Sequence, residues 1–283
     1  MDTIIGLGKA GCAIADKFSE YSQYFVYKMD IGLKRTSCTF PLERYENHED
    51  YEKKMPPLGD FFSDVEGEVL FIVGGGGRVS SSCLAILEHL KHCKINILYI
   101  RPDRTFLGAD AKLLDNMAFG ILQEYTRSGV FEKIFLIDNQ VLDSILPGTS
   151  IKKYYDSLNE MIASTIHMLN KFNHTEPVLY SLGGGTPVGA RICTIGVVNL
   201  EKNQDKDFFN LDNVTDVGYY YAYNTKKLEE SCGLYKEIKD GIKVKLDHFK
   251  RVMYGVYETD YEQDYCYCVK YTSIIQEMHS EEL

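Results

Sequence analysis

Short apolar runs alternate with amphipathic stretches through the first half of the chain, and this alternation predicts its elements. The apolar runs have strand-like composition, and apolar residues recur at helical spacing in the segments between them. Strands that alternate with helices are typical of a parallel sheet covered by helices, so the fold class is α/β. The predicted strands are Thr3–Ile5, Tyr24–Met29, Glu68–Val73, Ile95–Ile100 and Lys133–Ile137.

Helices are predicted after three of these strands. The first ends near Phe18, the second carries the apolar residues of Leu84–Leu90, and the third ends near Arg127. Residues 31–66 are polar and contain three prolines, so we interpret them as a long excursion over the surface.

A long helix is predicted at the centre of the chain, after the break at Pro147-Gly148. Between Ile151 and Phe172, apolar residues recur every three or four positions, which fits a 3.6-residue period. At about 1.5 Å per residue, this helix would be roughly 33 Å long and could cross a whole domain.

The remaining residues are rich in tyrosine and favour strands, with one helical segment near Lys226–Lys239. We expect strands around Arg191–Val198, Val217–Tyr223 and Tyr265–Tyr271. The chain therefore divides into a nucleotide-type domain (1–150), a central core helix (151–173) and a smaller α+β C-terminal domain (174–283).

Composition narrows the class of protein. The 283 residues include 45% hydrophobic and 25% charged residues, a balance typical of globular proteins, and carry a net charge of −10. Such an acidic surface disfavours general binding to nucleic acid or anionic lipid. The longest apolar run is about five residues, far below the roughly 18 that span a bilayer, so no membrane insertion is expected.

The cysteines and the start of the chain bear on its location. Eight cysteines contain no C-x-x-C pair, so no metal site is predicted. A strand predicted from Thr3 leaves no room for a signal peptide. Reduced thiols and a cytoplasmic location are therefore the expectation.

Two glycine loops, Gly6–Gly11 and Gly74–Ser82, each follow a strand and precede a helix. Backbone N–H groups in such loops face an anion at the helix N-terminus. Gly6-x-Gly8-x-x-Gly11 also matches a dinucleotide fingerprint, with Asp30 near the place of a ribose-binding acid. The alternative for this loop is a tight turn that only packs the helix on the sheet.

The second loop is more informative. Its four consecutive glycines are costly unless the backbone must approach something closely. Arg78 and the hydroxyls of Ser80–Ser82 add groups suited to phosphate oxygens. Together the two loops could hold a polyphosphate from both sides.

A pocket for a base is predicted near the central helix. Tyr155 and Asn159 are four residues apart and project from one helical face, and Asn139 follows the fifth strand. A ring can stack on a purine while amides hydrogen-bond its edge. The alternative is that Tyr155 is a core residue and Asn159 an ordinary polar residue of an amphipathic helix.

These segments resemble the tubulin/FtsZ superfamily, in the family's order, over about residues 3–170. The resemblance implies a fold of that type, GTP or GDP as the ligand, Mg²⁺ held through its phosphates as an option, and longitudinal self-assembly. It implies nucleotide contacts at Gly8, Lys9, Ala10, Gly11 and Cys12, at Gly74, Gly75, Gly76, Gly77, Arg78, Val79 and Ser80, at Arg104 in the loop near the ribose, and at Asn139, Tyr155 and Asn159.

The sequence departs from the family pattern at two places. Arg78-Val79-Ser80 stands where the family continues its glycine-rich loop with Thr-Gly, so a different phosphate geometry is expected, with Arg78 as a direct ligand or in solvent. Leu107 precedes Gly108 where an acidic ribose ligand is expected. Ser181–Thr186 looks like a second signature loop but follows the central helix, where a turn or hinge is expected.

In relatives, acidic residues after the core helix activate water at the nucleotide of the next subunit. Glu176 is the single acid between Asn173 and Ala190, so it is the candidate catalytic residue, and weak or absent GTP hydrolysis is expected. A divergent bacterial, phage or plasmid protein fits the short chain. Two alternatives remain: a Rossmann-type NAD(P)-dependent oxidoreductase that uses Gly6–Gly11 and Asp30, and a non-enzymatic scaffold that kept the fold and lost the nucleotide.

Overall fold

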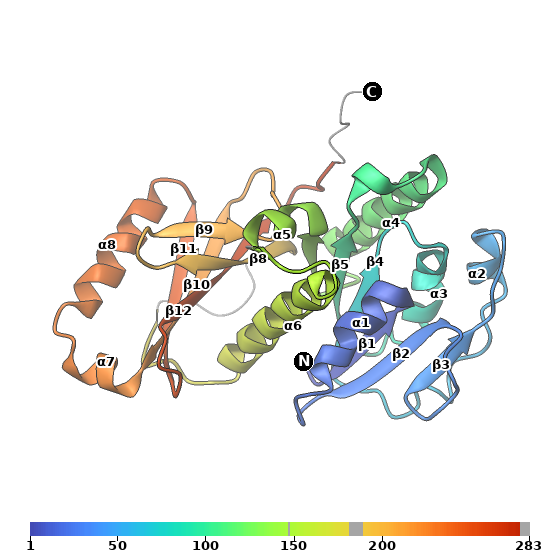
Figure 1. Ribbon diagram of the computed structural model, residues 1–283, viewed down its shortest axis with the longest axis horizontal. Helices are drawn as coiled ribbons and strands as arrows, with labels where there is room; N and C mark the ends of the chain where they lie inside the picture. Colours follow the sequence, from blue (N-terminus) through green and yellow to red (C-terminus); the bar gives the residue numbers. More distant parts are fainter. Residues whose placement is uncertain (147, 181–188, 278–283) are drawn as a thin grey trace.

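The computed structural model describes residues 1–146, 148–180 and 189–277, and these form one twelve-stranded sheet flanked by helices (Figure 1). Its first half is parallel, in the order β3-β2-β1-β4-β5-β6. The five predicted strands of this half are confirmed. The bounds are β1 Thr3–Leu7, β2 Phe25–Ile31, β3 Thr39–Leu42, β4 Glu68–Gly74, β5 Lys94–Arg101 and β6 Lys133–Asp138.

Helices cover both faces of the parallel half, which explains why its strands are apolar without alternation. On β4, Leu70 and Ile72 pack under α1 (Gly8–Phe18) and α6 (Tyr154–Asn173). Phe71 and Val73 point the other way, toward α3 (Cys83–Glu88) and α4 (Ala109–Arg127).

The long central helix α6 is confirmed, and it packs between the two halves of the molecule (Figure 1). On one side it meets α1, where Lys17 Nζ lies 2.7 Å from a carboxylate oxygen of Asp156 and 3.2 Å from one of Glu160. On the other side, the Phe172 ring stacks on Tyr257 with centroids 4.5 Å apart. The helix begins three residues after Ile151, because 151–153 form a turn.

The second half of the sheet is mixed, in the order β8-β12-β10-β11-β7, with β9 paired to β8. Alternate tyrosines of β10 serve two cores: Tyr220 faces α6, while Tyr219, Tyr221 and Tyr223 face α8. The bounds are β7 Leu179–Tyr180, β8 Ile192–Asn199, β9 Gln204–Asp207, β10 Asp216–Asn224, α7 Thr225–Glu230, α8 Leu234–Leu246, β11 Arg251–Thr259 and β12 Tyr265–Thr272.

Some elements differ from the sequence prediction. The excursion at 31–66 contains β3 and a short helix, α2 (Glu49–Lys53), and it buries Phe61 and Phe62 against the sheet. The helix expected over Leu84–Leu90 is the short α3, which ends at Glu88, and a 3₁₀ turn, η1 (Arg78–Ser82), precedes it within the second glycine loop. The helical segment near 226–239 is two helices, α7 and α8, and α5 (Asn139–Ile145) follows β6 directly.

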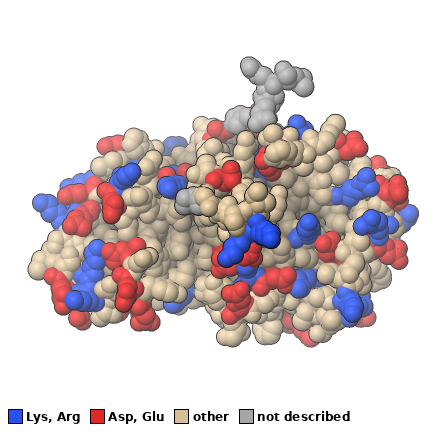
Figure 2. Space-filling view, in the orientation of Figure 1, with Lys and Arg blue, Asp and Glu red and all other residues tan. Residues whose placement is uncertain are grey.

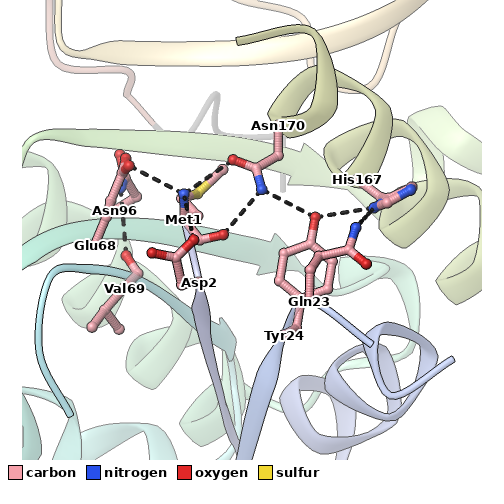
Figure 3. A network of polar contacts seen from close by, with 9 residues as sticks. All are labelled: Met1, Asp2, Gln23, Tyr24, Glu68, Val69, Asn96, His167 and Asn170. Atoms are coloured by element: carbon pink, nitrogen blue, oxygen red, sulfur yellow. Dashed lines mark hydrogen bonds and ion pairs between the residues drawn. The ribbon is translucent and has the colours of Figure 1, made fainter. Parts of the chain in front are cut away.

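A chain of hydrogen bonds ties the last turns of α6 to the start of the sheet (Figure 3). The amino group of Met1 donates to Glu68 Oε2 (3.2 Å) and to Asn170 Oδ1 (3.1 Å). Asn170 Nδ2 donates to Tyr24 Oη (3.1 Å), which lies 3.0 Å from His167 Nδ1. The C-terminal end of α6 therefore lies at the amino-terminal edge of the parallel strands.

Candidate functional site

The strand order reverses between β1 and β4, and both predicted glycine loops lie there. The chain leaves β1 toward β2 and β3 on one side, whereas β4, β5 and β6 follow on the other. Leu7 at the end of β1 is paired with Val73 near the end of β4. In open α/β sheets, ligands bind in the crevice at this reversal, outside the carboxyl ends of the strands.

In the first loop, packing requires two of the three glycines. A Cβ on Gly6 would lie 2.5 Å from the carbonyl oxygen of Gly11, and one on Gly11 would lie 2.4 Å from that of Ile72. Gly8 differs, because it has a φ of +69° and the nearest atoms to its Cβ position, in Val79, are 3.9 Å away. The turn interpretation accounts for Gly6 and Gly11, whereas Gly8 has open space at its Cβ position and needs glycine for its positive φ.

Helix α1 presents its N-terminus to the crevice without a side-chain cap. Leu7 occupies the N-cap position and makes no capping hydrogen bond, so no Leu7 side-chain cap competes with a ligand for the first-turn N–H groups. Lys9 and Ala10 are exposed there. Cys12 is buried below them, where its thiol donates to Gly6 O (3.3 Å) and burial raises its pKa to about 12. A neutral Cys12 is therefore a packing residue rather than a nucleophile.

The second loop lies against the first. A Cβ on Gly74 would be 3.2 Å from the Cβ of Ala10, and Gly76 has a φ of +75°. Ser80 Oγ donates to Gly74 O (2.5 Å), so this buried hydroxyl holds the loop together instead of pointing outward. Arg78 is exposed and makes no ion pair or hydrogen bond within the described residues.

Gly75 rests on a buried polar network that sequence reasoning missed. A Cβ there would lie 1.8 Å from Asp115 Oδ1 and 2.2 Å from Tyr99 Oη. Tyr99 Oη donates to Asp115 Oδ1 (2.6 Å), and Arg104 Nη1 donates to Asp115 Oδ2 (2.7 Å). Burial raises the pKa of Asp115, while the hydrogen bond from Tyr99 and the Arg104 guanidinium oppose the shift. Arg104, predicted near the ribose, also donates to Asn116 Oδ1 (2.7 Å).

The residues predicted to hold a base come from α5 and α6. Tyr155 is 70% exposed with its ring edge-on to Tyr154, so the alternative that it is a core residue is wrong. Asn139 begins α5 and Asn159 lies in the second turn of α6. Both amides are partly exposed and have no hydrogen-bond partner in the described part of the chain. Asp30 lies near the end of β2, next to Pro41 of β3, and its Oδ1 accepts a hydrogen bond from Ile31 N (2.8 Å).

Glu176 lies far from these loops. It is exposed and follows α6, whose 20 residues rise about 30 Å from the base-binding end. Because the end of α6 contacts Met1, Glu176 is near the opposite edge of the sheet and cannot reach the glycine loops of its own chain. The Ser181–Thr186 segment lies outside the described residues.

One group of potential metal ligands occurs in the described ranges, and it lies in the C-terminal half. Asp205, Asp207 and Cys268 approach one another closely enough to share an ion. Lys270 Nζ already lies 3.0 Å from Asp205 and 2.7 Å from Asp207, and Lys245 Nζ lies 2.7 Å from Asp205. These lysines neutralise both carboxylates, so the group is a buried ion-pair network.

A parallel sheet with glycine loops at its reversal, a long core helix and a second mixed sheet together define a tubulin/FtsZ superfamily fold. Comparison with solved structures confirms this fold. A GTPγS-form protofilament of TubZ from Bacillus thuringiensis serovar israelensis is similar over 95% of this chain and 86% of its own, with 16% identity and a TM-score of 0.68. GDP-bound CetZ1 from Haloferax volcanii is similar over 97% and 94%, with 17% identity and a TM-score of 0.67.

A third similar structure is an empty FtsZ dimer from M. jannaschii, with 13% identity, coverage of 95% and 87%, and a TM-score of 0.65. No family model and no curated protein sequence matches the chain. None of the helices in the described ranges has both the length and the apolar composition needed to cross a bilayer. On the face in Figure 2, basic and acidic side chains are interspersed.

Proposed function

We propose that this chain is a tubulin/FtsZ-like guanine-nucleotide-binding protein that assembles longitudinally into filaments. One observation carries the proposal. Asn139, Tyr155 and Asn159 remain partly or largely exposed, and none of these polar groups has a hydrogen-bond partner among the described residues. Such groups are unexplained by packing and match what a purine requires.

Different residues would bind different parts of the nucleotide. Backbone N–H groups of Gly8–Gly11 and of Gly76 and Gly77 would bind the phosphates, whereas Gly75 N already donates to Ile100 O (2.9 Å). The α1 N-terminus, which has no side-chain cap, favours the phosphate charge. Arg78 compensates for the departure from the family loop as a charged phosphate ligand. Tyr155 stacks on the base while the two amides bond its edge. Mg²⁺, where bound, would be held through the phosphates.

The solved neighbours support this choice of ligand and partner. One is a GTPγS-form protofilament and another carries GDP, so the fold is compatible with guanine nucleotides and with head-to-tail assembly. A Rossmann-type oxidoreductase would leave Asn139 and Asn159 without a role. A scaffold that had lost its ligand would equally leave both amides without a role.

The base assignment is tested with purified protein. We expect guanine nucleotide to copurify or bind, and Asn159→Ala to weaken GTP binding roughly tenfold, as expected for one lost buried hydrogen-bonding partner. Asn173→Ala, an exposed residue at the other end of α6, is the matched control and should leave affinity unchanged. Equal affinity for ATP and GTP refutes the base assignment. Nicotinamide dinucleotide in the extract favours the oxidoreductase, and failure to bind any nucleotide favours the scaffold.

Hydrolysis is proposed to be slow or absent, because Glu176 is the single acid between Asn173 and Ala190. Its place at the far end of α6 suits action on the nucleotide of the next subunit, not its own. A steady-state GTPase assay over a range of protein concentrations, with Glu176→Ala and the exposed Glu229→Ala as control, tests this. Brisk phosphate release that rises steeply with concentration and disappears only in Glu176→Ala would overturn slow turnover.

A further inference from the structure

Helix α4 is apolar on its outward face as well as on the face that packs on the sheet. Phe119 and Leu122 belong to the core. Four other apolar side chains, spaced four residues apart, form a continuous row on the solvent side, whereas an ordinary surface helix is polar there. This α4 row is Leu113 (55% exposed), Met117 (55%), Ile121 (42%) and Tyr125 (40%).

A glycine lies beside this row, and no contact among the described residues requires it. Gly120 is in the interior of a 19-residue helix, where glycine is among the poorest helix formers. A Cβ at this position would meet no atom within 4 Å, so neither packing nor backbone conformation requires it. Between Met117 and Ile121, a residue without a side chain allows a second helix to approach closely.

We propose that the α4 rows of two copies of this chain pack against each other across a two-fold axis, with the helices antiparallel and crossing at Gly120. Residues four apart form the ridges that interlock in the commonest class of helix packing, at a crossing angle of about −50°. A two-fold contact uses the same surface on both copies, which a self-complementary row provides.

Charge at the helix ends favours this orientation. Asp110 is exposed in the first turn of α4 and makes no ion pair within the described residues. Arg127 is in the last turn, 55% exposed and bonded to Glu124. Antiparallel pairing places Asp110 of each copy at the same end of the contact as Arg127 of the other, and it opposes the two helix dipoles.

The contact is small, and its strength follows from its size. Met117 and Ile121 also line a groove of ≈ 430 Å³ beside α2 and α3, which extends the apolar surface beyond the helix itself. Even so, one helix face buries less than the roughly 1,600 Å² of a standard interface. We therefore expect a dissociation constant on the order of 100 μM. This side-by-side pairing goes beyond the proposed function and requires no nucleotide.

Sedimentation equilibrium of the full chain without added nucleotide, at concentrations on the order of 10 to 1,000 μM, tests the pairing. The wild type should fit a monomer–dimer equilibrium, and Met117→Glu should weaken it at least tenfold. Val244→Glu, on α8 and 54% exposed, is the matched control and should not change it. Gly120→Gln separates pairing from folding, because it should raise the unfolding temperature while weakening the dimer at least tenfold.

A charge exchange tests the orientation. Asp110→Lys should weaken the dimer severalfold, and adding Arg127→Glu in the same chain should restore it. The proposal is overturned by a wild type that stays monomeric, by equal effects of Met117→Glu and Val244→Glu, by a Gly120→Gln dimer of unchanged strength, or by failure of the exchange to restore pairing. Asn159→Ala should leave the dimer intact, so failure of nucleotide binding is distinguishable from failure of the pairing.

Discussion

Replacing Gly75 with alanine should destabilise the fold through the network beneath the glycine loop. The new methyl group would lie 1.8 Å from Asp115 Oδ1 and 2.2 Å from Tyr99 Oη, so at least one of these groups must move. Asp115 is fully buried and holds both Tyr99 and Arg104 by short hydrogen bonds. Each such bond to a charged group contributes about 1.5–3 kcal/mol, and a broken buried ion pair costs about 3–5 kcal/mol. We expect a loss of about 3–5 kcal/mol.

Thermal unfolding followed by circular dichroism measures this loss. In a chain of this size, each kcal/mol shifts the midpoint by about 2–4 °C, so Gly75→Ala should lower it by roughly 6–20 °C. Gly77→Ala is the control in the same loop, because its Cβ would lie no closer than 3.5 Å to Ser80 Oγ and its φ of −85° suits alanine. Equal midpoints for the two variants would refute the reasoning.

Two further predictions concern single ionisable side chains. Arg78→Ala should weaken binding of GTP more than that of guanosine, measured by calorimetry, since the guanidinium is proposed to contact phosphate; equal changes would remove that role. Burial lowers the pKa of His167, and Gln23 Nε2 donates to its Nδ1, so the neutral ring is the one that stabilises the fold. Its contribution is therefore present above the ordinary pKa of about 6.5 and lost as pH falls through the lower folded value. Denaturant unfolding from pH 8 to 5 should show this fall in the wild type and a flatter profile in His167→Gln.

The elements that sequence predicted well are those with a long, local signal. Helix α6 follows from apolar residues at intervals of three and four over 20 positions, and β4 follows from a buried apolar run. Helix α5 was missed because it has only seven residues. Asp138, whose Oδ1 caps it by accepting from Gln140 N (2.8 Å), was the available signal, an Asp immediately before a short amphipathic run. Strand β11 was missed although Arg251–Thr259 is rich in β-branched and aromatic residues.

The candidate site also contains features that local sequence predicts and features that depend on packing. Glycine loops between strand and helix are local motifs, so both loops and their meeting could be predicted from the order of elements. The support of Gly75 by Asp115 could not be, because 40 residues separate them and only the packing of α4 on β5 brings them together. The roles of Ser80 and Cys12 also depend on orientation. Their side chains turn toward the backbone carbonyls of Gly74 and Gly6, which residue type alone does not reveal.

The glycines of the two loops differ in whether packing or a positive φ makes glycine necessary at their position. Gly6, Gly11 and Gly75 are required by contacts shorter than 3 Å that any Cβ would make, so the fold alone explains them. Gly77 meets no such contact and has an ordinary φ, yet glycine there is destabilising by roughly 0.5–1 kcal/mol relative to alanine. Gly8 needs its positive φ but has open space around it. Gly77, which the fold does not require, is explained if a ligand must approach its backbone closely. Gly77→Ala should therefore leave stability unchanged or slightly raised while GTP affinity falls, the opposite pattern to Gly75→Ala.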